Sequence, residues 1–124
     1  MKPLLILATT LLISLPFTSN AQHSGLDAAL NKGNVADLGT YFADRLDISI
    51  PGTEATLAAG EASRILANFF TQNPVKGYNR AHLTAPQTGR AAYSLGDLYT
   101  ANGTFRIYLY YDAQNKVSEI RIQK

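Results

Sequence analysis

Two carboxylates in the stretch FADRLDISIPG, Asp44 and Asp47, are candidates for catalytic chemistry. A carboxylate held inside a cavity could act as a general base. However, apolar and polar residues alternate through this stretch, which is the period of a strand with one buried face. The apolar members, which must take the buried face, are Leu46, Ile48 and Ile50. We therefore expect both carboxylates to point away from the interior, solvated or paired with a neighbour such as Arg45.

His82 is the second candidate for chemistry. It lies in a predicted strand, residues 78–85, where the alternation places it on one face with Tyr78 and Arg80. A histidine beside an arginine and a tyrosine could act as an acid or base near neutral pH. We favour the alternative, a half-exposed sheet residue, because the spacing identifies no carboxylate partner. The other histidine, His23, falls in what we expect to be a loose N-terminal end.

Several kinds of site find no support in the sequence. It contains no cysteine, only two histidines, and no carboxylate loop typical of a metal site. It contains no glycine-rich phosphate motif, and its serines lack the context of a nucleophile elbow. The formal net charge of +2 is too small to indicate a nucleic-acid partner. We therefore expect no cofactor, no metal and no nucleic acid.

A surface rich in tyrosine and arginine is the strongest functional signal. Along residues 104–111, apolar side chains alternate with polar and aromatic ones, and residues 117–123 continue the pattern. Tyrosine and arginine are enriched at binding hot spots, whereas tyrosine also suits any sheet face through its strand propensity. Both interpretations stay open. The residues that we assign to this surface, or to a pocket beside it, are Arg80, His82, Tyr93, Arg106, Tyr108, Tyr110 and Arg121.

The elements that would position these residues follow from hydrophobic spacing. Two short helices meet at a corner, Gly33-Asn34, and a third covers residues 61–72, where apolar residues recur at helical intervals. Asn34 can cap the second helix, because Asp37 follows three residues later. After the third helix, strands are predicted over residues 78–85, 91–100, 104–111 and 117–123, with Asn102-Gly103 typical of a type I′ hairpin. Helices followed by an antiparallel meander indicate an α+β fold with helices on one sheet face.

The first 21 residues have the layout of a secretory signal peptide. Lys2 precedes an almost wholly apolar run, residues 4–15, and small residues precede a cut after Ala21. We expect cleavage because the run is short for a hydrocarbon core of ~30 Å. The prediction is a signal peptide over residues 1–21 and a single domain over residues 22–124. This domain would be exported to the periplasm or the cell exterior, without stable membrane insertion.

The order of these elements and several short motifs resemble a known superfamily. The opening ALNKGNVADLGTYFADRLDISIPG is similar to that of the nuclear-transport-factor-like (NTF2-like) cone proteins, in which two helices split at a Gly-Asn corner precede a strand ending at Pro-Gly. More closely, ILANFFTQNPV, AAYSLGDLYTANGTFRIYLYY and SEIRIQK resemble a secreted bacterial domain-of-unknown-function family, number 4783 (DUF4783). The resemblance implies a cone of three N-terminal helices packed on a curved antiparallel β-sheet.

The resemblance also bears on catalysis. The superfamily includes ketosteroid isomerases, in which a carboxylate before the proline of the first strand removes a proton while a tyrosine of the first helix stabilises the enolate. In this sequence those positions hold Ile50 and Leu26, so isomerase chemistry at that place is not expected. Cone-fold relatives commonly pair through the outer sheet face, which adds weight to a homodimer.

Two hypotheses follow. The first is an exported, non-catalytic interaction domain that homodimerises through its Tyr/Arg sheet face, and it predicts a filled or small apolar cone. The alternative is a small-molecule-binding protein or enzyme, isomerase-like or dehydratase-like, with His82, Arg106 or Tyr93 as polar groups around a small apolar ligand. It predicts a pocket of at least ~300 Å³ inside the cone, with converging polar side chains.

Overall fold

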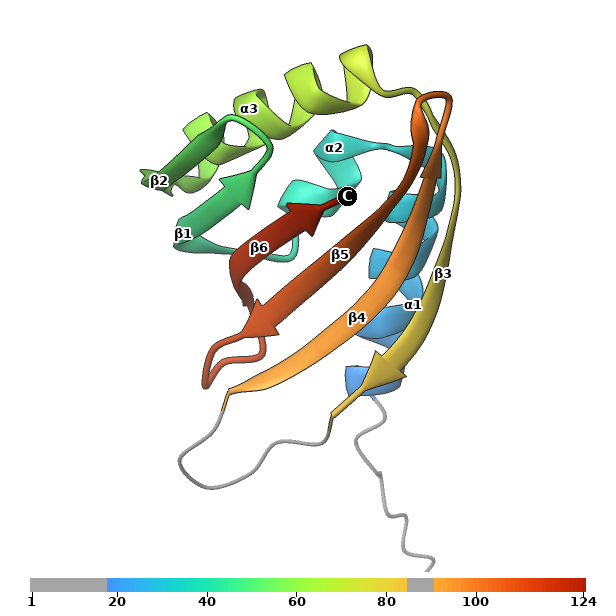
Figure 1. The fold of residues 1–124 in the computed structure, drawn as a ribbon. Coiled ribbons are helices and arrows are strands. Elements are labelled where there is room, and N and C mark those ends of the chain that lie inside the picture. Colours follow the sequence, from blue (N-terminus) through green and yellow to red (C-terminus); the bar gives the residue numbers. More distant parts are fainter. Residues whose placement is uncertain (1–17, 85–90) are drawn as a thin grey trace, which may run out of the picture.

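A computed structural model describes residues 18–84 and 91–124, with side chains from His23 onward (Figure 1). Its elements are α1 (Thr18–Lys32), α2 (Val35–Gly39), β1 (Phe42–Ile50), β2 (Thr53–Ala58), α3 (Ala59–Gln72), β3 (Val75–Leu83), β4 (Ala92–Thr100), β5 (Gly103–Tyr111) and β6 (Val117–Gln123). The strands form one sheet in the order β2-β1-β6-β5-β4-β3. In Figure 1 the long strands β3, β4 and β5 curve together, and α1 runs along one side of them. The α+β class and the curved sheet agree with the prediction.

The start of α1 differs from the prediction. Residues 22–25, expected to be a loose end, are helical, and the helix begins at Thr18, so its backbone crosses the predicted cleavage position after Ala21. Most of the predicted signal peptide, residues 1–17, lies outside the described residues. Every helix within residues 18–84 and 91–124 is too short or too polar to span a membrane.

The arrangement of helices and strands also corrects the prediction in two ways. Only α1 and α2 precede the sheet, whereas α3 follows β1 and β2, so the three helices are not all N-terminal. The sheet is not wholly antiparallel either, since β1 and β6 pair in parallel. The hairpin of β1 and β2 turns at the predicted Pro51-Gly52 corner, where Gly52 has a φ of +86°, a conformation that glycine adopts without strain.

The corner between the first two helices forms as predicted. Gly33, with a φ of +66°, ends α1, which is the usual place for a left-handed glycine. Asn34 then caps α2, because its side-chain oxygen accepts a hydrogen bond from the backbone N–H of Asp37 at 3.1 Å. This cap fixes the direction in which the chain leaves α1.

The inner face of the sheet and the helices share one apolar core. Leu26 and Ile50, which stand at the isomerase positions, are only 1% and 8% exposed. Phe69 of α3 packs edge-on against Phe105 of β5, with ring centroids 5.2 Å apart. Other side chains that are less than 2% exposed are Leu30, Leu38, Leu46, Leu66, Leu98, Ile107, Leu109, Val117 and Ile120. Each such burial stabilises the fold by ~1.5–3 kcal/mol, in a chain without disulfides.

A β-bulge in β3 changes which side chains face the helices. Arg80 lies opposite Gly96 of β4, but His82 lies opposite Leu95, so Ala81 is an extra residue in β3. The extra residue reverses the alternation. Arg80 therefore faces the helix side, and His82 faces the outside. The prediction that His82 shares a face with Tyr78 and Arg80 is wrong for this reason.

Candidate functional site

Five of the seven predicted site residues form one continuous row on the outer face of the sheet. The rings of Tyr93 in β4 and Tyr110 in β5 lie directly opposite, with centroids 5.5 Å apart. His82 extends the row on one side, 5.9 Å from Tyr93. Tyr108 stacks beside Tyr110 at 6.5 Å, and the Arg121 guanidinium lies 5.7 Å from the Tyr110 ring centroid. We call these five residues the aromatic row.

Arg106 lies on the same outer face beside the aromatic row. Its Nη2 donates a hydrogen bond to Asp97 Oδ1 at 3.2 Å, across the β4–β5 ladder, and its side chain stays 48% exposed. A hollow of about 350 Å³ opens at this point. Its lining residues are Asp97, Thr104, Phe105, Arg106, Tyr108, Gln123 and Lys124.

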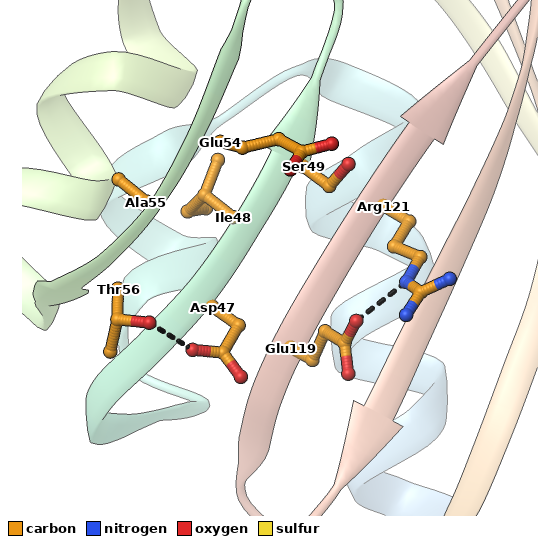
Figure 2. Close-up of a pocket in the computed structure, with 8 residues that line it drawn as sticks. All are labelled: Asp47, Ile48, Ser49, Glu54, Ala55, Thr56, Glu119 and Arg121. Carbon is orange, nitrogen blue, oxygen red and sulfur yellow. Dashed lines mark hydrogen bonds and ion pairs between the residues drawn. The ribbon is translucent and has the colours of Figure 1, made fainter.

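A second hollow, of about 470 Å³, lies farther along the same face, over β2, β1 and β6 (Figure 2). Asp47 is at its edge and accepts a hydrogen bond from the Thr56 hydroxyl at 2.6 Å. Arg121 donates a hydrogen bond to Glu119, two residues earlier in the same strand, β6. Asp47 is thus an exposed, hydrogen-bonded surface residue, as the strand period predicts, and Asp44 is exposed as well. Neither hollow is part of the cone interior.

The helix side of the sheet holds a group of polar residues that the sequence prediction missed. Arg80, assigned above to the Tyr/Arg surface, instead faces α1, and its Nε lies 3.6 Å from Asp27 Oδ2. His23 of α1 is buried and meets the Tyr111 ring edge-on at 5.0 Å. Asp27 thus lies half-buried between α1 and the sheet, a position that side-chain alternation along the strands does not predict. We refer to six residues as the inner polar cluster: His23, Asp27, Tyr78, Arg80, Ser94 and Tyr111.

Burial controls the protonation of this cluster. Desolvation, with help from the positive charge of Arg80, lowers the pKa of His23. Desolvation raises the pKa of Asp27, although Arg80 opposes the change. Burial also raises the pKa of Tyr111 to about 12, against the effect of its hydrogen bond with Ser94. At neutral pH the imidazole and the phenols are therefore uncharged, which leaves Arg80 as the cation of the cluster.

Helical spacing could have identified part of the cluster. His23, Asp27 and Leu30 follow at intervals of four and three, which places them along one face of α1. The predicted cleavage after Ala21 hides this signal, because it leaves His23 in a short N-terminal end and not in a helix. No group of three His, Asp or Glu residues able to hold a metal is present in the described part of the chain.

The curved sheet, with helices packed on its inner face, defines a protein of the NTF2-like, cystatin-like cone class. An NTF2-like protein of unknown function from Cytophaga hutchinsonii, 11% identical, has a TM-score of 0.61, over 89% of this chain and 92% of its own. The family model of DUF4783, a domain of unknown function, matches residues 24–123 of this chain. The chain therefore belongs to this family.

Solved structures of the family agree with this assignment. A DUF4783 protein from Bacteroides fragilis is 31% identical, with a TM-score of 0.73 over 90% of this chain and 99% of its own. One from Bacteroides ovatus is 28% identical, with a TM-score of 0.74 over 82% of this chain and 93% of its own. A comparison with curated proteins finds no match.

Proposed function

We propose that this protein is a non-catalytic interaction domain that pairs with a second copy of itself through the outer face of its sheet. The aromatic row carries this proposal. Four rings and a guanidinium from four different strands lie next to one another on the outer face, which no helix covers within residues 18–84 and 91–124. Tyrosine and arginine are the side chains that most often contribute binding energy at protein interfaces.

The charges around the aromatic row support a second copy rather than a strongly charged partner. Acidic and basic side chains alternate on this face, with Arg106 beside Asp97 and Arg121 beside Glu119. A twofold interface brings a patch against itself, so the patch must be self-complementary. A face with both signs of charge meets this condition, whereas a face of one sign would repel its copy.

The isomerase-like alternative receives less support from the cone interior. Leu26 and Ile50 are buried in the apolar core and offer neither a base nor an oxyanion donor. His82, Tyr93 and Arg106, which that alternative requires inside the cone, lie on the outer face.

Export is the remaining part of the proposal. We propose that residues 1–21 are removed and residues 22–124 reach the periplasm or the cell exterior, which mass spectrometry of the mature protein would test.

The mass of the protein in solution tests the pairing. Sedimentation equilibrium over a range of concentrations should give twice the monomer mass for the wild type. The double variant Arg106→Ala/Tyr108→Ala should be monomeric, because it removes a ring from the aromatic row and the adjacent cation. Arg64→Ala on α3, an exposed residue away from this face, is the control and should remain dimeric. A monomeric wild type at all concentrations would contradict the proposal.

A further inference from the structure

The inner polar cluster contains three polar atoms that lack a partner. These are Nδ1 of His23, the hydroxyl oxygen of Tyr78 and Nη1 of Arg80; each is shielded from solvent and has no hydrogen bond within the described part of the chain. A buried polar group without a partner costs ~1–3 kcal/mol, and native proteins leave few such groups. Three of them, on two elements packed against each other, indicate a partner that the protein itself does not supply.

We propose that the inner polar cluster binds the carboxylate group of a small organic acid through Arg80 Nη1 and the Tyr78 hydroxyl. This site is on the opposite side of the sheet from the aromatic row, so the inference stands independently of the proposed function. The ligand reaches the cluster where Asp27 and Arg80 come to the surface, since their side chains are 30% and 31% exposed.

The chemistry of the donors selects the ligand. Arg80 and Tyr78 both donate hydrogen bonds, so the ligand must present acceptor oxygens. A guanidinium is planar and matches a carboxylate well. The negative charge of Asp27 beside Arg80 disfavours a doubly charged group such as phosphate. Because His23 is neutral, Arg80 is the cation that a singly charged ligand would neutralise.

Two local features of the backbone place both donor residues on the inner face of the sheet. The bulge at Ala81 turns Arg80 toward α1. Gly96 leaves room for the phenol of Tyr78, since a Cβ on Gly96 would come within 2.4 Å of the Tyr78 hydroxyl oxygen. Tyr78 and Arg80 thus occupy successive inward positions of β3, opposite Leu98 and Gly96. Their position depends on the fold of β3 and β4 and not on a loop.

The two histidines give a direct readout of binding, because one lies on each side of the sheet. Acetate is the probe, titrated at constant ionic strength and followed by NMR of the imidazole signals. The His23 signal should shift and saturate in the millimolar range, while the His82 signal stays unchanged. Arg80→Lys and Tyr78→Phe should each weaken the apparent affinity at least tenfold. Arg64→Lys on α3 and Tyr99→Phe on β4 change exposed residues outside both proposed sites; they are the matched controls and should leave the affinity unchanged.

Three results would overturn the inference. The first is a His23 signal that does not saturate. The second is the same response to chloride as to acetate, which would mean an unselective anion effect. The third is an equal loss of affinity in the inner variants and the control variants. Since Lys and Phe keep most of the volume and the charge of the residues they replace, a folding check by circular dichroism separates lost binding from lost structure.

Discussion

Asp27 of α1 and Arg80 of β3 form the ion pair that joins a helix to the sheet, with Oδ2 and Nε 3.6 Å apart. The other ion pairs between described residues lie within α3 or on the outer face of the sheet. The pair is partly exposed, so water screens it in part, but α1 covers Arg80 deeply enough to bury its Nη1 atom. Its position makes it a link between the two layers of the fold.

Replacing Asp27 with Asn tests how much the ion pair contributes to stability. Desolvation disfavours the charged Asp27 carboxylate more than Arg80 favours it, so at neutral pH the variant should not lower the free energy of unfolding. Glu61→Gln is the matched control, because it breaks the exposed Arg64–Glu61 pair of α3 and should change the free energy of unfolding by less than ~0.5 kcal/mol. Urea unfolding measures both. A loss of about 1 kcal/mol or more in Asp27→Asn alone would show that the attraction of Arg80 outweighs the cost of desolvation.

Acidification should weaken the fold through His23. Its folded pKa is lowered below 6.5, so the unfolded chain binds the proton more readily and stability falls as the pH drops below 6.5. The raised pKa of Asp27 acts in the opposite direction, because the folded state binds the Asp27 proton more readily than the unfolded chain does. Unfolding free energies at pH 7.5 and 5.5 should therefore differ in the wild type.

His23→Phe removes the titrating group and keeps a ring against Tyr111. In this variant the difference between pH 7.5 and pH 5.5 should become smaller. The control is His82→Gln on the exposed outer face, which should keep the pH dependence of the wild type. If the His23→Phe variant also kept the pH dependence of the wild type, the burial of neutral His23 would not be the cause of that dependence.

Gly96 should tolerate no side chain. A Cβ there would lie 2.4 Å from the Tyr78 hydroxyl oxygen and 2.6 Å from the backbone oxygen of Asn79, so Gly96→Ala should cost ~1–3 kcal/mol by overpacking. Gly60→Ala is the opposite case. Gly60 lies in α3 with nothing within 4 Å of its added Cβ, so alanine should stabilise the helix by up to ~1 kcal/mol. Thermal unfolding of both variants compares them, and a neutral Gly96→Ala would disprove the close approach of Tyr78.

Ser94 and Tyr111 should behave as a coupled pair. Their hydroxyls are 2.9 Å apart and buried between β4 and β5. Ser94→Ala should destabilise the protein by ~1–2 kcal/mol, because it leaves the Tyr111 hydroxyl without its partner. The double variant Ser94→Ala/Tyr111→Phe should be more stable than the sum of the single effects predicts. Additive effects in this double-mutant cycle would mean that the hydrogen bond does not contribute.

The sequence predicts most of the fold because hydrophobic periodicity and turn residues are local signals. The corner at Gly33-Asn34 and the alternation of β5 are examples, and both are present in the structure. β2 escaped prediction because its residues, apart from Leu57, are small or polar and gain their strand conformation from pairing with β1. The parallel pairing of β1 with β6 is a property of the whole sheet, which no local pattern encodes.

The candidate site was predicted on the outer face and missed on the inner one, for a physical reason. Strict alternation holds along β5, so it places Tyr108 and Tyr110 together on one face, whereas the face of Tyr93 in β4 stays open in the sequence. Along β3, one bulge residue, Ala81, reverses the alternation and separates Arg80 from His82. Bulges carry a weak sequence signal, and the inward position of Arg80 becomes evident only from its pairing with Asp27.

The location of the pairing surface is the most direct test of the account. The chain has no cysteine, so a single spin label can be attached at Ser49→Cys on the outer face or at Asn68→Cys on α3. Electron–electron dipolar spectroscopy then measures the distance between the two labels of a dimer. Pairing through the outer face predicts a clear coupling at position 49, with a shorter distance than at position 68. A shorter distance at position 68, or no coupling at either position, would contradict it.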